Sequence, residues 1–247
     1  MKDHGLHRVP PSVRALLREF RDRLVTILGV ELVGVYLMGG IAFPGFRPSG
    51  DVDFFVVTRG ILRRRQREEL SAIHRTLAET HQFGNLLDGF YISSARARSG
   101  LRPTGLGGGR DDSWALHREH LRRGAYIALV GPPAKDVFLA PTPSELERDL
   151  AREELYALSK LGDHPHWAVL QLCRIALSRT TGNVVRSKLQ AGEWALTHFP
   201  REWHPLLRSA LKIYRGRGGS GDFARVKRQS AAFSLIATPR STGRRRS

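Results

Sequence analysis

The chain has 247 residues, 41% of them hydrophobic, which is enough for one large domain or two modest ones with packed cores. Its single cysteine, Cys173, excludes an intramolecular disulfide and a cysteine-based metal site, and the apolar run around it predicts a buried position. No apolar stretch is long enough to span a bilayer, and the first residues lack the apolar segment of a secretion signal. We therefore expect a cytoplasmic protein without a membrane partner.

The net charge is strongly positive, with 40 Lys and Arg against 23 Asp and Glu, or +17 at pH 7. Between Arg215 and Ser247 there are nine basic residues and one aspartate, so this segment contributes +8. Such a balance is typical of contact with nucleic acid or polyphosphate, or of a solvated basic surface. No zinc-finger spacing, RRM-type aromatic box or clear helix-turn-helix accompanies it. Nucleic acid stays open as a partner of the basic tail at 239–247, which we expect to be disordered, but it is not favoured.

The first elements form a helix–strand–turn–strand pattern. Apolar residues at helical spacing predict a helix over 10–28, and the apolar run at 33–38 predicts a strand. That run ends in Gly39 and Gly40. A turn-rich link then leads to a second apolar run at 54–57, the next predicted strand.

Two aspartates open the second strand, in the stretch SGDVDFFVV. Because side chains alternate across a strand, Asp51 and Asp53 point to one face and Val52 and Phe54 to the other. Two carboxylates roughly 6–7 Å apart along a strand can hold one or two hard cations by oxygen. The preceding glycines let backbone amides approach an anion such as phosphate. Alone, a DxD pair at a strand mouth and a Gly-Gly turn are more often structural, so the metal–nucleotide interpretation depends on the order and spacing of the two motifs and on the later segments of the chain.

The next predicted strand carries an acid among apolar residues. Asp88 lies in LLDGFYI, and an acid inside such a strand is costly unless it faces solvent, a cation or a catalytic site. A solvated acid at the strand edge is the alternative. The other elements expected in the first half are a helix at 61–81, a loop at 93–112 that could act as a lid or as a plain connector, a helix at 114–124 and a strand at 126–130.

From about residue 142 every segment has helical periodicity and no strand pattern. Thr142-Pro143-Ser144-Glu145 is a helix-opening signal, and we place a domain boundary between residues 141 and 142. The predicted domains are therefore 1–141 and 142–238, followed by the tail. Further helices are expected at 166–180, 187–198, 201–214 and 222–237.

A glycine turn, a spacer of about ten residues and Asp-x-Asp at a strand start resemble the nucleotidyltransferase superfamily. The later segments LQLCRIALSRTTGNVV, SKLQAGEWAL and PREWHPLLRSALKIYRG are similar to the aminoglycoside adenylyltransferases, in the branch that modifies streptomycin and spectinomycin. The similarity runs from about residue 30 to 237. It implies an α+β protein, with an N-terminal nucleotidyltransferase domain of a small mixed sheet flanked by helices, followed by an all-α helical bundle.

The resemblance also implies roles for the three carboxylates. Asp51 and Asp53 would be ligands of two Mg²⁺ ions, and Asp88 would be the general base that accepts the proton of the substrate hydroxyl. The implied reaction is transfer of AMP from ATP to that hydroxyl with release of pyrophosphate. The family's base is commonly Glu, so Asp88 is shorter by one methylene.

Four further residues are assigned to the nucleotide by the resemblance. Arg174 and Lys188 would reach the phosphates from the helical domain, while Gly39 and Gly40 would form the phosphate turn. The alternatives are a charge at the end of a buried helix for Arg174 and a solvated first-turn residue for Lys188. The family has Ser where this chain has Gly40, which removes a hydroxyl donor and predicts weaker ATP binding by roughly 1.5–3 kcal/mol.

The drug itself is not fixed by the resemblance. The segment before Trp114 is short, and the family's tryptophan used for streptomycin has no clear counterpart. His164 stands where the streptomycin-modifying branch carries an acid, with Asp163 one residue earlier. Aminoglycosides are polycations that a +17 protein repels unless the pocket is locally acidic, and the candidate acids are Asp149, Glu153, Glu154 and Asp163.

Three functions are therefore open. The first is a monomeric enzyme that adenylylates an aminoglycoside-type small molecule, an antibiotic-resistance activity. The second keeps the chemistry but uses RNA or a protein side chain as acceptor. The third is a nucleotide-binding module that has lost catalysis through its changes at Gly40 and Asp88. The enzyme is favoured because all three carboxylates are present.

Overall fold

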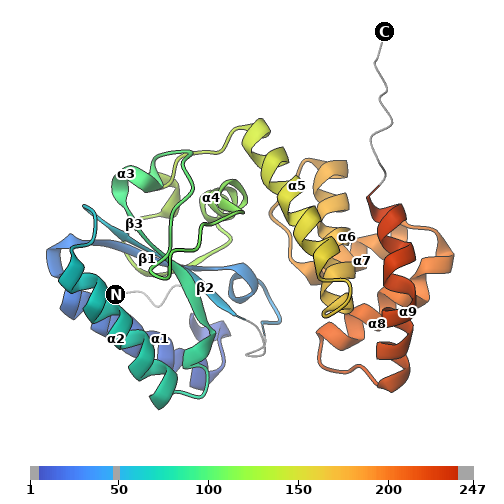
Figure 1. The fold of residues 1–247 in the computed structure, drawn as a ribbon, viewed down its shortest axis with the longest axis horizontal. Coiled ribbons are helices and arrows are strands. Elements are labelled where there is room, and N and C mark those ends of the chain that lie inside the picture. The colour runs from blue at the N-terminus through green and yellow to red at the C-terminus, as the bar shows by residue number, and fades with distance from the viewer. Residues whose placement is uncertain (1–5, 47–50, 239–247) are drawn as a thin grey trace, which may run out of the picture. The chain divides into compact units, whose positions relative to one another are not determined.

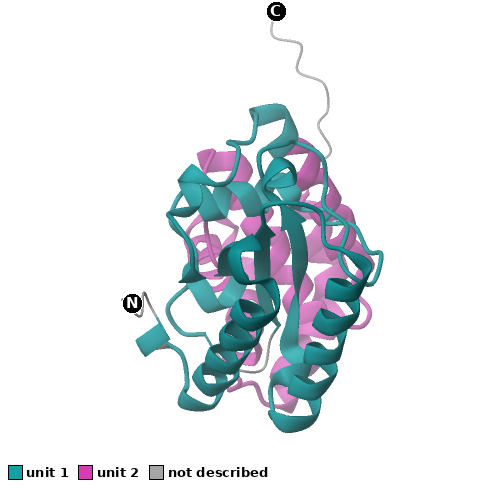
Figure 2. Cartoon of the chain, turned by 90° about the vertical axis from the view of Figure 1, so that its left-hand side faces the viewer, with its two compact units in different colours: residues 1–146 teal, residues 147–247 magenta. Residues whose placement is uncertain are grey.

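The computed structural model describes residues 6–46 and 51–238 (Figure 1). Its chain divides into two compact units, residues 1–146 and 147–247, shown in separate colours in Figure 2. The division falls inside helix α5 (Pro143–Ser159). The predicted boundary between residues 141 and 142 stays a prediction, and the basic tail at 239–247 lies outside the described residues.

A four-stranded mixed sheet forms the centre of the first unit. The strands are β1 (Leu32–Met38), β2 (Val52–Thr58), β3 (Leu87–Ser93) and β4 (Ile127–Val130), in the spatial order β3-β2-β1-β4. Strand β1 is antiparallel to β2 and β4, while β2 and β3 are parallel. This sheet, together with the helical second unit, confirms the predicted α+β class.

One face of the sheet is covered by α1 (Pro11–Leu28) and α2 (Arg64–Thr80), which lie side by side in Figures 1 and 2. Both helices bury apolar stripes at helical spacing, as the sequence predicts. Val52, Phe54 and Val56 of β2 face this layer and belong to its buried core.

The opposite face is covered by α4 (Trp114–Arg122) and a 3-10 turn, η5 (Ala134–Asp136). Phe55 and Val57 of β2 are buried here against Trp114 and Phe138. The alternation of β2 therefore places the odd-numbered side chains on the α4 face, and Asp53 belongs to that set.

The segment at 93–112, predicted as a loop, begins with a short helix, α3 (Ser94–Ala97). Ser93 caps it by accepting a hydrogen bond from the Arg96 backbone N–H at 3.2 Å, a local signal that the prediction overlooked. The prediction of a loop is wrong for these four residues. The rest is irregular apart from a bridge between Thr104 and Arg110.

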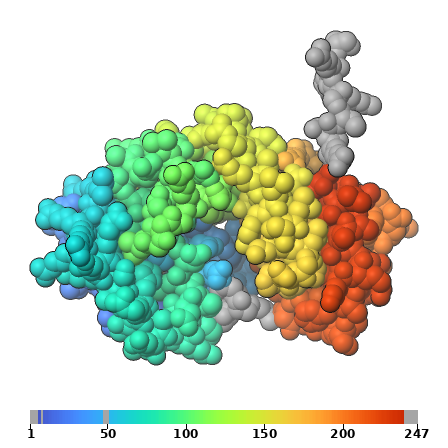
Figure 3. Space-filling model, in the orientation of Figure 1, coloured from blue at the N-terminus to red at the C-terminus, as the bar shows by residue number. Residues whose placement is uncertain are grey.

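The second unit is all helical over its described residues. After α5 come α6 (Pro165–Thr181), α7 (Lys188–His198), α8 (His204–Tyr214) and α9 (Ser220–Ala237). In the space-filling view of Figure 3, α5 is visible in yellow and α9 in red. Cys173 is fully buried in the core of this bundle, as predicted. The helix predicted over 201–214 is split: residues 201–203 form a 3-10 turn, because Pro205 occupies the first turn of a separate helix α8.

Among the helices within the described ranges, none combines the length and the apolar character needed to cross a membrane.

Candidate active site

The glycine turn lies directly against Asp53. Gly39 follows β1, has φ +68°, and a Cβ built on it would overlap Oδ2 of Asp53. Glycine is needed here both for the left-handed backbone and for the space that the carboxylate occupies. Gly40 is different, because a Cβ there would meet only the Phe46 ring at 3.8 Å. The structure thus brings together the glycine turn and the Asp-x-Asp motif that the sequence singled out.

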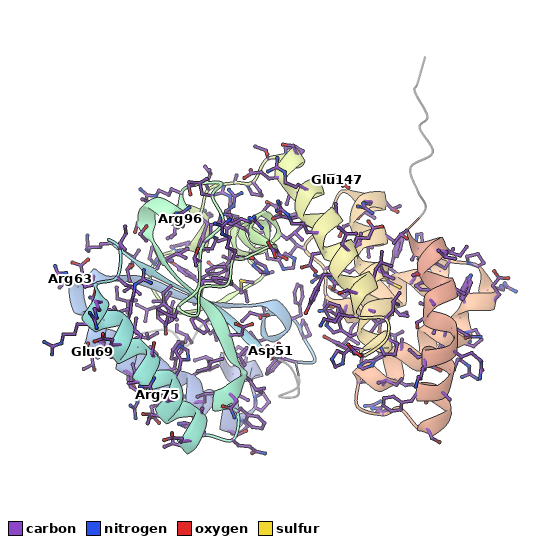
Figure 4. All side chains as sticks on the ribbon, viewed as in Figure 1. Asp51, Arg63, Glu69, Arg75, Arg96 and Glu147 are labelled. Carbon is purple, nitrogen blue, oxygen red and sulfur yellow. The ribbon has the colours of Figure 1, made fainter. Side chains whose placement is uncertain are left out.

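The third carboxylate is Asp53's direct neighbour on the adjacent strand. In the parallel pairing of β2 with β3, the Cα of Asp53 is in register with that of Asp88. Neighbouring strands lie about 4.8 Å apart, so these side chains project side by side from one face. Figure 4 shows Asp51 where β2 begins. The three acids named from the sequence therefore lie at one edge of one sheet face.

The electrostatics of Asp88 reflect this crowding of negative charge. Partial burial raises the pKa of Asp88 above its usual range, and the charges of Asp51 and Asp111 raise it further, whereas His117 and the Gly89 backbone N–H lower it. The carboxylate stays accessible to solvent. The neighbouring negative charge that disfavours ionisation of Asp88 would be offset by a cation bound beside it.

The carboxylate set fits Mg²⁺ by the chemistry of its donors. Over residues 6–46 and 51–238, no group of three or more His, Cys, Asp or Glu side chains is arranged to hold a metal ion. Mg²⁺ sites of nucleotide enzymes commonly use one or two carboxylates and complete their octahedron with water and substrate phosphates. Asp51 and Asp53 match that smaller requirement.

An aspartate–histidine pair beside these acids was missed in the sequence. Asp111 is 3% exposed; its Oδ2 lies 2.8 Å from Nδ1 of His117, and its Oδ1 accepts from the Ser113 backbone N–H at 2.9 Å. The His117 ring packs on Phe55 with centroids 6.0 Å apart. The only sequence signal was an acid just before a helix with a histidine six residues later. This spacing does not indicate a site until the register of the sheet is known.

The two predicted phosphate ligands, Arg174 and Lys188, are on the helical unit. Arg174 on α6 forms a 3.5 Å ion pair with Glu153 of α5. Lys188 is the first residue of α7, and its Nζ lies 4.9 Å from the centroid of the Trp167 ring. Both side chains are partly buried, and the role predicted for them stays a prediction.

The acids proposed for an acidic pocket are largely engaged within the helical unit. Asp149 is buried and pairs with Arg152 at 2.6 Å, Glu153 contacts Gln171 and Arg174, and Glu154 pairs with Arg179. Asp163 is exposed. Most of the negative charge on this stretch of α5 is thus balanced by neighbouring cations.

The comparisons with known proteins agree with this organisation. Residues 139–235 match the family model for the aminoglycoside adenylyltransferase C-terminal domain. Aminoglycoside (3'') (9) adenylyltransferase of Rhizobium radiobacter is 34% identical over 97 residues, which are 37% of this chain and 34% of that protein. The chain thus spans about a third of the length of this curated relative.

Longer matches cover most of the chain at lower identity. Spectinomycin 9-adenylyltransferase of Staphylococcus aureus is 25% identical over 232 residues, covering 85% of this chain and 86% of that protein. Among solved structures, spectinomycin adenyltransferase AAD(9) from Enterococcus faecialis with ATP and spectinomycin superposes with a TM-score of 0.73 at 17% identity. That superposition covers 90% of this chain and 98% of the other, and it shows a shared fold.

The relatives of the chain are adenylyltransferases, and its fold is shared with a spectinomycin adenyltransferase, in agreement with the nucleotidyltransferase predicted from the sequence. Within that class, the predicted resemblance to the aminoglycoside nucleotidyltransferases is confirmed.

Proposed function

We propose that the protein transfers AMP from ATP to a hydroxyl group of an aminoglycoside-type small molecule and releases pyrophosphate. The observation that carries this proposal is the meeting of Asp53, Asp88 and the Gly39 turn on one sheet face. The similarity to aminoglycoside and spectinomycin adenylyltransferases supports the acceptor class.

Asp51 and Asp53 would hold Mg²⁺ at the start of β2. Bound there, Mg²⁺ would neutralise charge on the phosphate oxygens and make phosphorus a better electrophile. The Gly39–Gly40 turn would let the triphosphate approach the backbone. Asp53, whose carboxylate lies over Gly39, connects the turn to the metal ligands.

Asp88 would accept the proton of the attacking hydroxyl. The acceptor oxygen forms a bond to the α-phosphorus, the bond from that phosphorus to the bridging oxygen breaks, and pyrophosphate leaves. No covalent intermediate with the protein is required, so the protein acts through positioning and charge. In this proposal Arg174 and Lys188 bind phosphate, Arg174 by two hydrogen bonds and Lys188 as a point charge.

The decisive experiment is pyrophosphate release from ATP–Mg²⁺ in the presence of streptomycin, spectinomycin and related drugs, with mass spectrometry of the acceptor. We expect release with at least one drug, a gain of one AMP on that drug, and loss of both signals in Asp53→Asn. Glu69→Gln is the control, since Glu69 lies on α2, on the other face of the sheet, as Figure 4 shows. No release across the panel, with ATP still bound, would refute the small-molecule proposal.

A macromolecular acceptor is the second candidate, favoured by the +8 charge of the segment from Arg215 to Ser247. RNA binding through such a segment would depend steeply on salt. Deleting residues 239–247 should then lower activity and flatten its salt dependence, whereas transfer to a small drug should be unchanged.

A further inference from the structure

The Asp111–His117 pair is held in place from several sides. Both oxygens of the buried Asp111 carboxylate have partners, the Ser113 backbone N–H and the imidazole. An ionised carboxylate can only accept hydrogen bonds, so Nδ1 of His117 carries a proton. That fixes the plane of the ring and leaves its Nε2 edge pointing away from Asp111.

The ring lies over the strand pair that carries the site. Its aromatic neighbour Phe55 is two residues beyond Asp53 on the same face of β2. Phe55 stacks on Phe90 at 5.6 Å, and Phe90 is two residues beyond Asp88 on β3. Two residues span about 6.6 Å along a strand, so Asp53 is one such step from Phe55, whose ring His117 contacts. His117 is also close enough to Asp88 for its charge to act on that carboxylate.

We propose that His117, fixed by Asp111, is a positioning residue for Asp88. This inference rests on the proposed function, because Asp88 is the proton acceptor of that reaction. The family's longer glutamate is here an aspartate, which has less reach and gains more from a neighbour that orients it.

In this arrangement the imidazole stands between the carboxylates of Asp111 and Asp88, with Nδ1–H toward Asp111 and Nε2–H donating to Asp88. It holds one oxygen of Asp88 and leaves the other for the acceptor hydroxyl. The proton released in the reaction goes to Asp88, and His117 keeps its own protons. Asp51 raises the pKa of Asp88 and His117 lowers it, which agrees with a position of His117 close to Asp88.

The first test is kinetic and uses His117→Asn. Asparagine keeps a donor for Asp111 but has neither the ring edge nor the charge. We expect kcat to fall roughly 10–100-fold, as for other residues that orient a functional group, with the KM for ATP and the melting temperature nearly unchanged. A wild-type kcat in His117→Asn would show that the pair only secures the start of α4, and would overturn the proposal.

The matched control is His81→Asn. His81 also pairs with a carboxylate, that of Glu19 at 2.7 Å, but it follows α2 on the opposite face of the sheet. The same substitution there removes an imidazole–carboxylate pair without touching the site. We expect its kcat to equal that of the wild type, and an equal fall in both variants would count against a specific role of His117.

A second measurement is independent of turnover. In protein with ¹⁵N-labelled histidine, the His117 ring signals are assigned by their loss in His117→Asn. At one fixed pH, Asp88→Asn should shift the Nε2 signal of His117, whereas Glu119→Gln, on the same helix, should not. Inactive wild-type enzyme together with this shift would refute the proposed function alone; an unmoved His117 signal would refute the positioning proposal whether or not the enzyme turns over.

Discussion

At the scale of single residues, two adjacent glycines differ completely in what they tolerate. Gly39 has a positive φ, and any side chain on it would occupy the place of the Asp53 carboxylate. Gly40 has ordinary backbone geometry and open space beside it. From the sequence the two form a single Gly-Gly turn, but in the structure only Gly39 has to be glycine.

Gly40→Ser should therefore fit and should strengthen ATP–Mg²⁺ binding. The added hydroxyl can donate to a phosphate oxygen, a charge-assisted hydrogen bond of about 1.5–3 kcal/mol, or roughly 10–150-fold in Kd. Isothermal titration calorimetry with a non-hydrolysable ATP analogue would measure it. Gly40→Ala should leave Kd unchanged and Gly39→Ala should abolish binding. A Kd for Gly40→Ser no tighter than that of Gly40→Ala would contradict a phosphate near this position.

A partly buried histidine gives the first unit a dependence on pH. His74 of α2 packs between the rings of Phe20 and Phe54, and its Nε2 lies 2.9 Å from the Tyr91 hydroxyl. Burial lowers the pKa of His74. The unfolded chain then binds a proton more readily than the folded one, so this stabilisation is complete above about pH 6.5 and declines as the pH falls toward the folded pKa.

We expect the wild type to lose more stability between pH 8 and pH 5.5 than His74→Gln, which cannot titrate. Each unit by which the pKa is lowered corresponds to about 1.4 kcal/mol. Thermal unfolding of both proteins at the two pH values would measure the difference between their slopes. Parallel slopes would mean that His74 is protonated as easily in the folded state as in the unfolded one.

At the scale of elements, α4 and the start of α5 are joined through a buried charge. The Arg118 side chain is fully buried, its Nη2 lies 2.6 Å from Oε1 of Glu145, and its guanidinium lies 5.4 Å from the centroid of the Trp114 ring. Glu145 also accepts from the Thr142 backbone N–H at 2.8 Å and so completes the capping box at the start of α5.

Glu145→Gln should test the ion pair without breaking the cap, because glutamine also serves in a capping box. The buried guanidinium loses its counter-charge, and we expect a loss of about 1.5–3 kcal/mol in the free energy of unfolding, measured in urea. Glu147→Gln is the matched control. Glu147 is 60% exposed in its pair with Arg179, so its loss should stay below about 1 kcal/mol. Equal losses would show that water already screens Arg118.

The elements themselves were largely predictable, and the site only in part. Apolar periodicity and local signals such as Gly29 after α1 or Thr142 before α5 depend only on residues close together in the sequence. Nearly every helix and strand could therefore be located from the sequence. The register of β2 on β3 is not local. It pairs Asp53 with Asp88 and brings His117 over Phe55, from segments that are far apart in the chain. The strand patterns pointed to the three acids and the resemblance gave them roles, but the Asp111–His117 pair required the fold.

At the scale of the whole molecule, the helical unit has its own core and its own charge balance. Leu170, Cys173 and Leu207 are among the fully buried residues of this core. The four ion pairs formed by Arg152, Arg174 and Arg179 all use acids of α5 between residues 147 and 154. These three cations are thus satisfied within the unit, provided that α5 is present.

A fragment of residues 142–238 should therefore fold alone, whereas one of residues 160–238 should not. The longer fragment keeps the capping box of α5 and every acid that pairs with Arg174 and Arg179. The shorter fragment lacks α5. It therefore exposes the core residues that Ala157 of α5 covers, and it leaves those two arginines without these acids. Circular dichroism should show a cooperative thermal transition for the first and a gradual one for the second. Cooperative unfolding of residues 160–238 would show that α5 is dispensable to the bundle. A gradual transition in both would mean that the bundle needs the first unit, and the two cores would then be one folding unit.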